Sequence, residues 1–355
     1  MKLENNEKYI SYCLQLAATA ESYVAPNPMV GAVIVCDGKI IGEGCHRRYG
    51  QAHAEVDAVN SVKDKKLFEE STIYVSLEPC SHFGKTPPCA NLIIEHKIPQ
   101  VVIGTLDPNP KVAGNGVKLL RDAGIDVTVG VLEKECRVLN KHFFTFHEQK
   151  RPYILLKWAQ TADGFIDKKR SNDEQPLLIS NTVTKQLTHK MRTQNQAIML
   201  GTNTVLADNP KLLASRWVGR NPVRVILDRQ GRIPESFNVM DGTSETLIFT
   251  ETEKENKANL RFLKIDFDEN VLQTIINELY KLNINSVLVE GGAHLLNGFI
   301  AADLWDEANV EVSRQIIGDG VSAPILNAFP SEISDIEEHK WMKFANSKNC
   351  FYICI

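Results

Sequence analysis

The stretches "HAEVDAV" at residues 53–59 and "EPCSHFGKTPPC" at residues 78–89 are the parts of the chain that most clearly indicate its fold and chemistry. The first sets His53 two residues before Glu55, and the second holds two cysteines with eight residues between them and a proline before each. An imidazole and two thiols can bind a metal, and a carboxylate beside them can carry a proton. Each of these residues alone is more often an ordinary part of a helix or a core.

The first half of the chain alternates between helical and β-rich patterns, which predicts a layered α/β domain over residues 1–147. Asp37-Gly38 between two β-rich runs predicts a hairpin with a type I′ turn. Thr86 is expected to cap a helix whose first residue is Pro87. The expected helices cover 7–20, 52–63, 86–97 and 114–124, and the expected strands cover 30–36, 39–44, 71–80, 101–108 and 125–132.

The charged stretch "HEQKRP" at 147–152 predicts a domain boundary, and a second α/β domain is expected over residues 151–355. Its expected strands lie at 153–159, 197–201, 223–228, 246–250, 286–290 and 308–314, and its helices near 181–193, 269–282 and 293–302. No repeat or low-complexity segment is found.

The spacing within the first stretch constrains where its two polar residues can lie. Residues two apart point to different sides of a regular helix, so His53 must sit at the helix entry if it and Glu55 share a site. Cys80 ends a predicted strand and Cys89 opens a predicted helix. One imidazole and two thiolates leave the fourth position of a tetrahedral zinc open to water, whose pKa zinc lowers towards ~7.

The combination of H-x-E with a later P-C and a second cysteine matches the signature of zinc nucleobase deaminases. A structural zinc site with His82 as a fourth ligand is an alternative, but it leaves Glu55 without a role. Cys13, Cys36, Cys136, Cys350 and Cys354 lie in apolar segments and are expected in the core, whereas Cys45 is unassigned.

Composition narrows the class of protein. The 355 residues carry a formal net charge of −4 with no basic block, which argues against a nucleic-acid partner. The polar start "MKLENNEKYI" has no apolar signal-peptide core, and no apolar run approaches the roughly 18 residues that span a bilayer. We therefore expect a cytoplasmic protein with a small-molecule substrate and no membrane partner.

The two opening stretches resemble the cytidine-deaminase superfamily, whose common members have only two residues between the cysteines. The longer gap here is typical of the bifunctional riboflavin-biosynthesis deaminase–reductase family. "APNPMVGAVIV", "GEGCHRRYGQAHAE" and "DPNPKVAGNG" are also similar to that family, and the resemblance covers residues 9–147.

The resemblance implies that His53, Cys80 and Cys89 bind one Zn²⁺ per chain and that Glu55 is the proton shuttle. The implied substrate is 2,5-diamino-6-ribosylamino-4(3H)-pyrimidinone 5′-phosphate, which would lose ammonia. By the same resemblance, its base, ribose and phosphate would be lined by Asn27, His46, Lys85, Asp107 and Asn109. Lys85 also suits a phosphate by its charge, whereas the last two residues suit a turn equally well.

Two features of the second half point to chemistry. Lys157 lies in an apolar strand, where a lysine needs a partner or a function. Glu290 precedes Gly291-Gly292 at a strand–helix junction, where phosphates can approach the N–H groups of a helix start. This second signal alone is weak, because Gly-Gly turns are common.

"KWAQTADG", "MRTQNQAIMLGTNTVLADNPKL", "RVILD" and "VEGG" occur in the order of the same family's reductase half, which is similar to dihydrofolate reductase. The resemblance implies reduction of the ribosyl group to ribityl by NADPH, giving 5-amino-6-ribitylaminouracil 5′-phosphate. The implied cofactor residues are Ala159, Leu178, Thr204, Asp208, Gly292, Ala293, His294, Leu295, Leu296, Asn297 and Gly298. The implied substrate residues are Lys157, Arg192, Leu212, Arg216 and Glu290.

The chain departs from the family pattern in several places. Leu178 stands where many members have tryptophan, and "NPKLLASRW" is one residue longer than usual before Arg216. Asp163 in "TADG" is a candidate near the site, although a turn role fits it equally. Nothing is transferred onto residues 165–177 or beyond 330.

The sequence thus predicts an N-terminal cytidine-deaminase-like α/β/α layered domain followed by a C-terminal dihydrofolate-reductase-like α/β domain. The predicted protein is a bifunctional enzyme and a homo-oligomer, either a dimer or a tetramer. Three alternatives stay open. They are a degenerate reductase domain behind an active deaminase, a deaminase of free or nucleic-acid bases with a binding module, and a zinc-stabilised scaffold.

Overall fold

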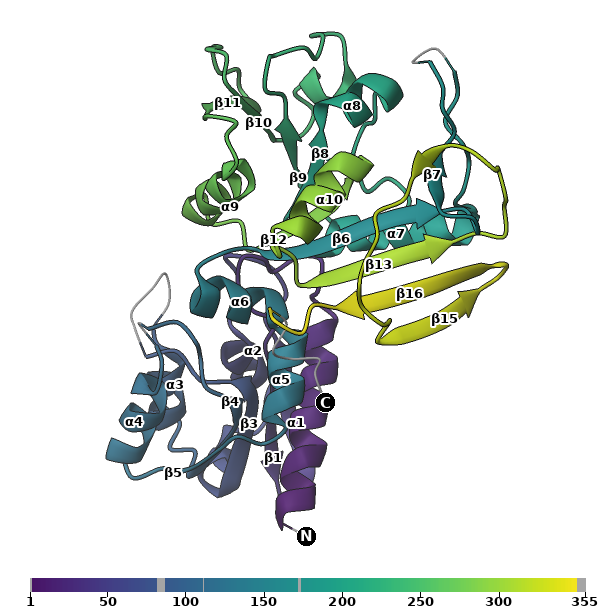
Figure 1. The fold of residues 1–355 in the computed structure, drawn as a ribbon. Coiled ribbons are helices and arrows are strands. Elements are labelled where there is room, and N and C mark those ends of the chain that lie inside the picture. Colours follow the sequence, from purple (N-terminus) through teal and green to yellow (C-terminus); the bar gives the residue numbers. More distant parts are fainter. Residues whose placement is uncertain (1, 82–86, 111, 172–173, 350–355) are drawn as a thin grey trace. The chain divides into compact units, whose positions relative to one another are not determined.

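The computed structural model describes residues 2–81, 87–110, 112–171 and 174–349 (Figure 1). The chain divides into two compact units, Met1–Lys150 and Arg151–Ile355. The division falls within the charged stretch that separates the two expected domains. None of the helices in the described ranges combines the length and the hydropathy needed to cross a membrane.

The first unit is built on a five-stranded sheet in the order β2-β1-β3-β4-β5. β1 pairs antiparallel with β2 and β3, whereas β3, β4 and β5 run parallel. The strands are β1 (Gly31–Cys36), β2 (Lys39–Cys45), β3 (Ser71–Leu77), β4 (Gln100–Thr105) and β5 (Asp126–Val129). The helices are α1 (Lys2–Ala18), α2 (Ala54–Ser61), α3 (Cys89–Glu95), α4 (Asn115–Asp122), α5 (Glu133–Leu139) and α6 (Lys141–Gln149), with a 3₁₀ helix, η1, at Lys65–Glu70.

Both faces of this sheet are covered, because the side chains of a strand alternate between its two faces. Ala32 and Ile34 of β1 pack with residues of α2, α3 and α4, whereas Val33 and Val35 pack with residues of α1 and α5. The predicted three-layer arrangement is therefore confirmed. The hairpin is confirmed too: Asp37 and Gly38 both have positive φ, at 49° and 72°, as a type I′ turn requires.

Two local predictions for this unit need correction. α3 begins at Cys89 with Pro88 as its N-cap, so Pro87 is not its first residue, and Thr86 lies outside the described residues. Proline is fixed at a φ that suits either position, so its presence alone does not set the start of the helix. Helices α5 and α6 were not predicted, because "EKECRVLNKHFFTFHEQ" follows the last strand without a turn signal.

The second unit has a nine-stranded sheet in the order β11-β10-β9-β8-β12-β6-β13-β16-β15. Its strands run parallel up to β13, and the last two pair antiparallel. The strands are β6 (Tyr153–Gln160), β8 (Ala197–Gly201), β9 (Val223–Leu227), β10 (Thr246–Thr250), β11 (Leu260–Lys264), β12 (Ser286–Gly291), β13 (Glu307–Val312), β15 (Glu332–Ile336) and β16 (His339–Ala345). A separate pair joins β7 (Phe165–Asp167) to β14 (Val321–Ser322).

Helices α7 (Thr182–Gln194), α8 (Thr202–Asp208), α9 (Val271–Lys281) and α10 (Ala293–Ala301), and the 3₁₀ helix η2 (Asn238–Met240), complete this unit. The largest core packs α9 and α10 against one face of β6, β8, β12 and β13. α8 contributes Val205 to a core on β8, β9 and β10, and α7 packs Met191 against β6, β12 and β16. The six strands and three helices predicted here are present, whereas α8 and the hairpin of β15 and β16 were not predicted.

Candidate functional site

Three elements of the first unit bring potential metal ligands together. His53 is the N-cap of α2 in extended backbone conformation, Cys80 follows β3, and Cys89 is the first residue of α3. Their ligand atoms all lie within 4.8 Å of one another. The Nδ1 atom of His53 is 3.6 Å from the Cys80 sulfur and 3.3 Å from the Cys89 sulfur. His53 thus occupies the helix entry that the H-x-E spacing requires.

The electrostatics of the cluster suit a cation. The pKa of the Cys80 thiol is lowered to about 4, because its sulfur accepts hydrogen bonds from the Cys89 thiol and from His53. The backbone N–H of Cys89 also donates to the Cys80 sulfur, at 3.3 Å. The pKa of Cys89 is raised, because its thiol donates a hydrogen bond to the Cys80 sulfur and is buried, and because a second thiolate beside the first would be repelled. A positive ion would relieve that repulsion, and one nitrogen with two sulfurs is a donor set that zinc prefers.

Glu55 lies in the first turn of α2 and is only 3 % exposed. Burial raises the pKa of its carboxyl to about 7. Glu55 lines a cavity of about 280 Å³ together with His53 and Cys80. A carboxyl group that is neutral or ionised near neutral pH can take up and release a proton beside the three ligands.

The rest of this cavity is polar. Asn27 donates from its amide to Nε2 of His46 at 3.1 Å, and Nδ1 of His46 lies 2.9 Å from the carbonyl oxygen of Ala52. The imidazole therefore carries its proton on Nδ1, and burial lowers its pKa. Asp107 and Asn109 also line the cavity. Lys85 and His82 lie outside the described residues.

Glu78 is a buried residue of this unit that sequence reasoning missed. Its carboxylate accepts backbone N–H groups from Asp107 at 3.3 Å, Gly114 at 2.9 Å and Val117 at 3.1 Å. It thereby ties the start of α4 and the segment that carries Asp107 to the end of β3. Its position directly before the Pro-Cys pair was the available signal.

In the second unit, a cavity of about 620 Å³ opens beside β6, β12 and the start of α10. The predicted residues that line it are Lys157, Ala159, Leu178, Thr204, Asp208, Glu290, Gly292, Ala293, His294 and Leu296. Leu178 is 68 % exposed, and Lys157 only 7 %. Burial lowers the pKa of Lys157, and the nearby carboxylates of Glu290 and Glu311 act in the opposite direction.

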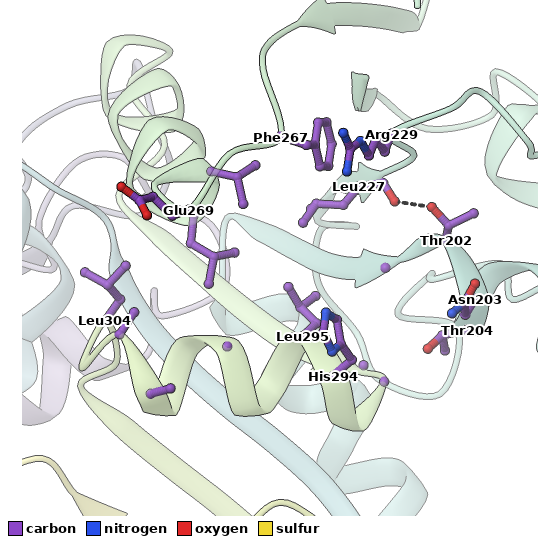
Figure 2. Close-up of a pocket in the computed structure, with 18 of the residues that line it drawn as sticks. Thr202, Asn203, Thr204, Leu227, Arg229, Phe267, Glu269, His294, Leu295 and Leu304 are labelled. Atoms are coloured by element: carbon purple, nitrogen blue, oxygen red, sulfur yellow. Dashed lines mark hydrogen bonds between the residues drawn. The ribbon is translucent and has the colours of Figure 1, made fainter. Parts of the chain in front are cut away.

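A second cavity, of about 870 Å³, shares Asn203, Thr204, Gly292 and His294 with the first. Figure 2 shows His294 and Leu295 on α10 below this cavity, with Arg229 beside Phe267 across from them. Gly292 has φ +62°, and a Cβ on it would lie 2.7 Å from the hydroxyl oxygen of Thr204. The backbone at the start of α10 therefore stays open to a ligand only with glycine at this position.

Of the other predicted residues of this unit, some line the larger cavity and some line neither cavity. Leu295 and Gly298 line the larger cavity, whereas Asn297 is exposed and lines neither. Leu212 is buried in the core with φ 55°, and Arg216 is exposed, its backbone N–H donating to Nδ1 of His189 at 3.3 Å.

Two charged residues singled out in the sequence form hydrogen bonds with their neighbours. Arg192 holds Glu290 through two hydrogen bonds, of 2.8 Å and 2.6 Å. The side chain of Asp163 accepts hydrogen bonds from Thr161 and from two backbone N–H groups, at Ile317 and Gly318. Asp163 does not line either cavity, so its contacts support the turn role.

Arg170 is a cavity-lining residue that was not predicted, because its segment carries no family motif. Its side chain is 5 % exposed and pairs with Asp208 and with Asp167, the latter at 2.6 Å. The predicted cofactor residue Asp208 is therefore already bound to an arginine. This contact ties the segment around β7 to α8.

Comparisons with known proteins agree with both halves of this description. Residues 3–105 match the model of the cytidine and deoxycytidylate deaminase zinc-binding region, and residues 152–347 match the model of the RibD C-terminal domain. A riboflavin biosynthesis protein RibD from Aquifex aeolicus is 40 % identical over 90 % of each chain. That of Escherichia coli is 35 % identical over 88 % of this chain and 89 % of its own.

A solved structure supports the same two-part description. A diaminohydroxyphosphoribosylaminopyrimidine deaminase/5-amino-6-(5-phosphoribosylamino)uracil reductase from Thermotoga maritima is 36 % identical, with a TM-score of 0.88 over 97 % of this chain and 99 % of its own. The chain is thus a two-domain protein that joins a deaminase domain to a reductase domain. It belongs to the family of the riboflavin biosynthesis protein RibD.

Proposed function

We propose that this bifunctional enzyme catalyses two successive steps towards riboflavin. The first hydrolyses an amino group from 2,5-diamino-6-ribosylamino-4(3H)-pyrimidinone 5′-phosphate and releases ammonia. The second uses NADPH to reduce the ribosyl group to ribityl, which gives 5-amino-6-ribitylaminouracil 5′-phosphate. The observation that carries the proposal is the convergence of one imidazole and two thiols within 4.8 Å, beside the buried carboxyl of Glu55.

His53, Cys80 and Cys89 would hold one zinc ion in the first unit. When bound, zinc supplies a Lewis acid that lowers the pKa of a water molecule. The lowered pKa of the Cys80 thiol supports this assignment, because the thiolate is the form that binds metal. Among the described residues, these three are the group that could ligate a metal, and His82, the alternative fourth ligand, lies outside those residues. A site with three protein ligands would leave the fourth position of a tetrahedral zinc to water.

Glu55 would move the proton. It would take a proton from water as the oxygen bonds to the amino-bearing carbon of the pyrimidine. It would then give that proton to the amino nitrogen as the carbon–nitrogen bond breaks, so that ammonia leaves. The pKa of about 7 supports both halves of this transfer at neutral pH.

The polar wall of the same cavity would recognise the substrate of the deaminase step. Asn27, His46, Asp107 and Asn109 line it and offer donors and acceptors to the base and ribose. Lys85 would meet the 5′-phosphate, a role that follows from the family resemblance and from its charge.

NADPH would lie along the two joined cavities of the second unit. The open backbone at Gly292 and the start of α10 support pyrophosphate binding there. Arg229 and Arg232 line the larger cavity, and Arg232 donates to the side chain of Asn203 at 2.8 Å. Such cations suit the 2′-phosphate that distinguishes NADPH from NADH. The proposed cofactor residues are Ala159, Leu178, Thr204, Asp208 and residues 292–298.

The substrate of the reductase step would lie against Lys157 and Glu290, with Arg192 holding the latter. Leu212 and Arg216 remain proposed substrate residues from the family pattern. Arg216 is exposed and next to His189, so a substrate phosphate reaching it would lie at the rim of the site. We further propose that the chain works in the cytoplasm as a dimer or tetramer.

The test supplies the purified chain with the diaminopyrimidine phosphate, with and without NADPH, and measures zinc, ammonia and NADPH oxidation. The proposal expects ammonia in both cases and NADPH oxidation only after deamination. Deamination without NADPH oxidation would instead identify a degenerate reductase domain. Ammonia release from cytosine, adenosine or guanine, and none from the phosphorylated substrate, would contradict the proposal.

A further inference from the structure

Glu311 on β13 is a fully buried carboxylate next to the lysine of the reductase cavity. One of its oxygens, Oε2, accepts the hydroxyl of Ser180 at 2.6 Å and lies 3.8 Å from Nζ of Lys157. The other, Oε1, lies 2.7 Å from Nδ1 of His339. Ser180 and Lys157 both line the cavity, whereas Glu311 does not. Glu311 therefore contacts two residues of the cavity wall without lining the cavity itself.

The charges around Lys157 can be assigned in pairs. Glu290 and Arg192 form a bidentate pair, which satisfies both charges. Lys157 is then balanced by Glu311, the other carboxylate that acts on it. A buried cation without such a partner tends to lose its proton.

The position of Glu311 is set by the C-terminal hairpin of β15 and β16. His339 begins β16, and Trp341 on the same strand lies opposite Glu311 in the antiparallel pairing. The indole N–H of Trp341 donates to the side chain of Asn309 at 3.2 Å, and its ring lies 6.0 Å from Nζ of Lys157. This hairpin lies beyond residue 330, a part of the chain onto which the sequence motifs place no functional residue.

We propose that Glu311, held by His339 from β16, is a positioning residue of the reductase site that keeps Lys157 charged and orients the hydroxyl of Ser180 at the cavity wall. This inference assumes the reductase function proposed above. It assigns the C-terminal hairpin a part in the reaction without contact to the substrate.

The expected sign follows from the environment of Lys157. Burial already lowers its pKa, and Glu311 opposes that shift, so removing the carboxylate should lower the pKa further. The other charged and titratable groups facing this cavity or its pairs belong to β7 and the segment after it, α7, α8, β12 and α10. They are Asp167, Arg170, Lys185, His189, Arg192, Asp208, Glu290 and His294. None of these is altered in the variants below.

The experiment measures the pH dependence of kcat/KM for NADPH oxidation with the deaminated intermediate, in the full chain. Glu311→Gln should move the alkaline limb to lower pH by about one to two units. The KM for NADPH and the deaminase activity of the same sample should stay unchanged. The matched control is Glu332→Gln, which removes an exposed carboxylate of the same hairpin, paired with Lys343 at 2.8 Å. The pH profile of this variant should coincide with that of the wild type.

His339 provides a second pair of variants in case Glu311→Gln does not fold. His339→Leu leaves a buried carboxylate oxygen without its donor, so the carboxylate is no longer held in place beside Lys157. It should therefore shift the limb in the same direction. His339→Gln keeps a donor and should restore the wild-type profile. An unchanged alkaline limb in both Glu311→Gln and His339→Leu would overturn the inference.

A failure of the reductase function itself would look different. The wild type would then oxidise no NADPH with the intermediate. In that case, the rate at which an amine reagent labels Lys157, followed by mass spectrometry across pH, still decides the inference. Labelling should begin at lower pH in Glu311→Gln than in the wild type, and coincident profiles would contradict it.

Discussion

At the scale of single residues, Glu55 is a buried carboxyl group beside the three proposed metal ligands, and burial raises its pKa to about 7. Glu55→Gln keeps the shape of the side chain but cannot carry a proton. We expect deamination to fall by about 10² to 10⁴-fold. Zinc content should stay at the wild-type level, because the three proposed ligands are untouched. Ammonia release and metal analysis measure the two quantities.

Glu95→Gln serves as the control for that variant. Glu95 is an exposed residue at the end of α3, and its replacement should change neither quantity. Undiminished ammonia release from Glu55→Gln would remove Glu55 from the reaction.

Arg229 allows a second prediction at this scale. Its side chain lines the larger cavity and pairs with Glu251 at 2.9 Å near the surface. If it meets the 2′-phosphate, Arg229→Ala should raise the KM for NADPH by about tenfold or more, the effect of one hydrogen bond to a charged group. The KM for NADH should not change. Steady-state kinetics with both cofactors measure the ratio.

Lys264→Ala, which removes an exposed cation from β11, is the control and should leave both values as they are. An equal rise for NADPH and NADH would show that Arg229 does not read the phosphate.

The sequence predicted the residues of the deaminase site better than the contacts that hold them. His53, Glu55, Cys80 and Cys89 fall in two short motifs, so the local pattern is enough to bring them to notice. Glu78 acts through backbone N–H groups that lie at least 29 residues away along the chain. Its place before the Pro-Cys pair could draw attention to the residue, but no local pattern shows such contacts, which is why its role emerged only from the structure.

At the scale of elements, Gly292 controls access to the start of α10. Gly292→Ala would place a Cβ 2.7 Å from the Thr204 hydroxyl oxygen and strain a residue with φ +62°. We expect a loss of about 1 kcal/mol or more in the free energy of unfolding of this unit, and weaker NADPH binding. Denaturant melts and NADPH titration measure these effects.

Gly201→Ala is the comparison variant. Its Cβ would meet no atom within 4 Å, and its φ is negative at −89°. It should leave the stability of the unit near the wild-type value. Equal melts for the two variants would show that the conformation at Gly292 carries no constraint.

The strands of the second unit differ in how well they can be recognised from the sequence. The central strands are long apolar runs buried on both faces, and such runs are easily recognised. The strands β15 and β16 read "EISDI" and "HKWMKFA", with charges within them, because one side of this antiparallel hairpin is exposed. The pairing of β16 with β13 is a contact between segments that are distant in the sequence, so it could not be seen in either segment alone.

At the scale of the whole molecule, the two activities are proposed to reside in two separate units of the chain. Removing zinc with a chelator should therefore abolish ammonia release from the diaminopyrimidine phosphate. The same sample should still oxidise NADPH when it is given the deaminated intermediate, because the residues proposed for reduction lie in Arg151–Ile355. Adding zinc back should restore ammonia release.

The chelator experiment would contradict the account if NADPH oxidation with the intermediate were lost together with deamination and returned only with zinc. A control with the chelator already saturated by zinc separates metal removal from direct inhibition.

The proposed function depends most directly on the order of the two reactions in one chain. The decisive measurement follows ammonia, NADPH and the mass of the pyrimidine product together, after the diaminopyrimidine phosphate is mixed with zinc-loaded protein and NADPH. We predict that ammonia appears first, that one NADPH is oxidised for each ammonia released, and that the product is the ribitylaminouracil phosphate. Ammonia release with the ribosyl group left unreduced, or no ammonia at all, would contradict the account.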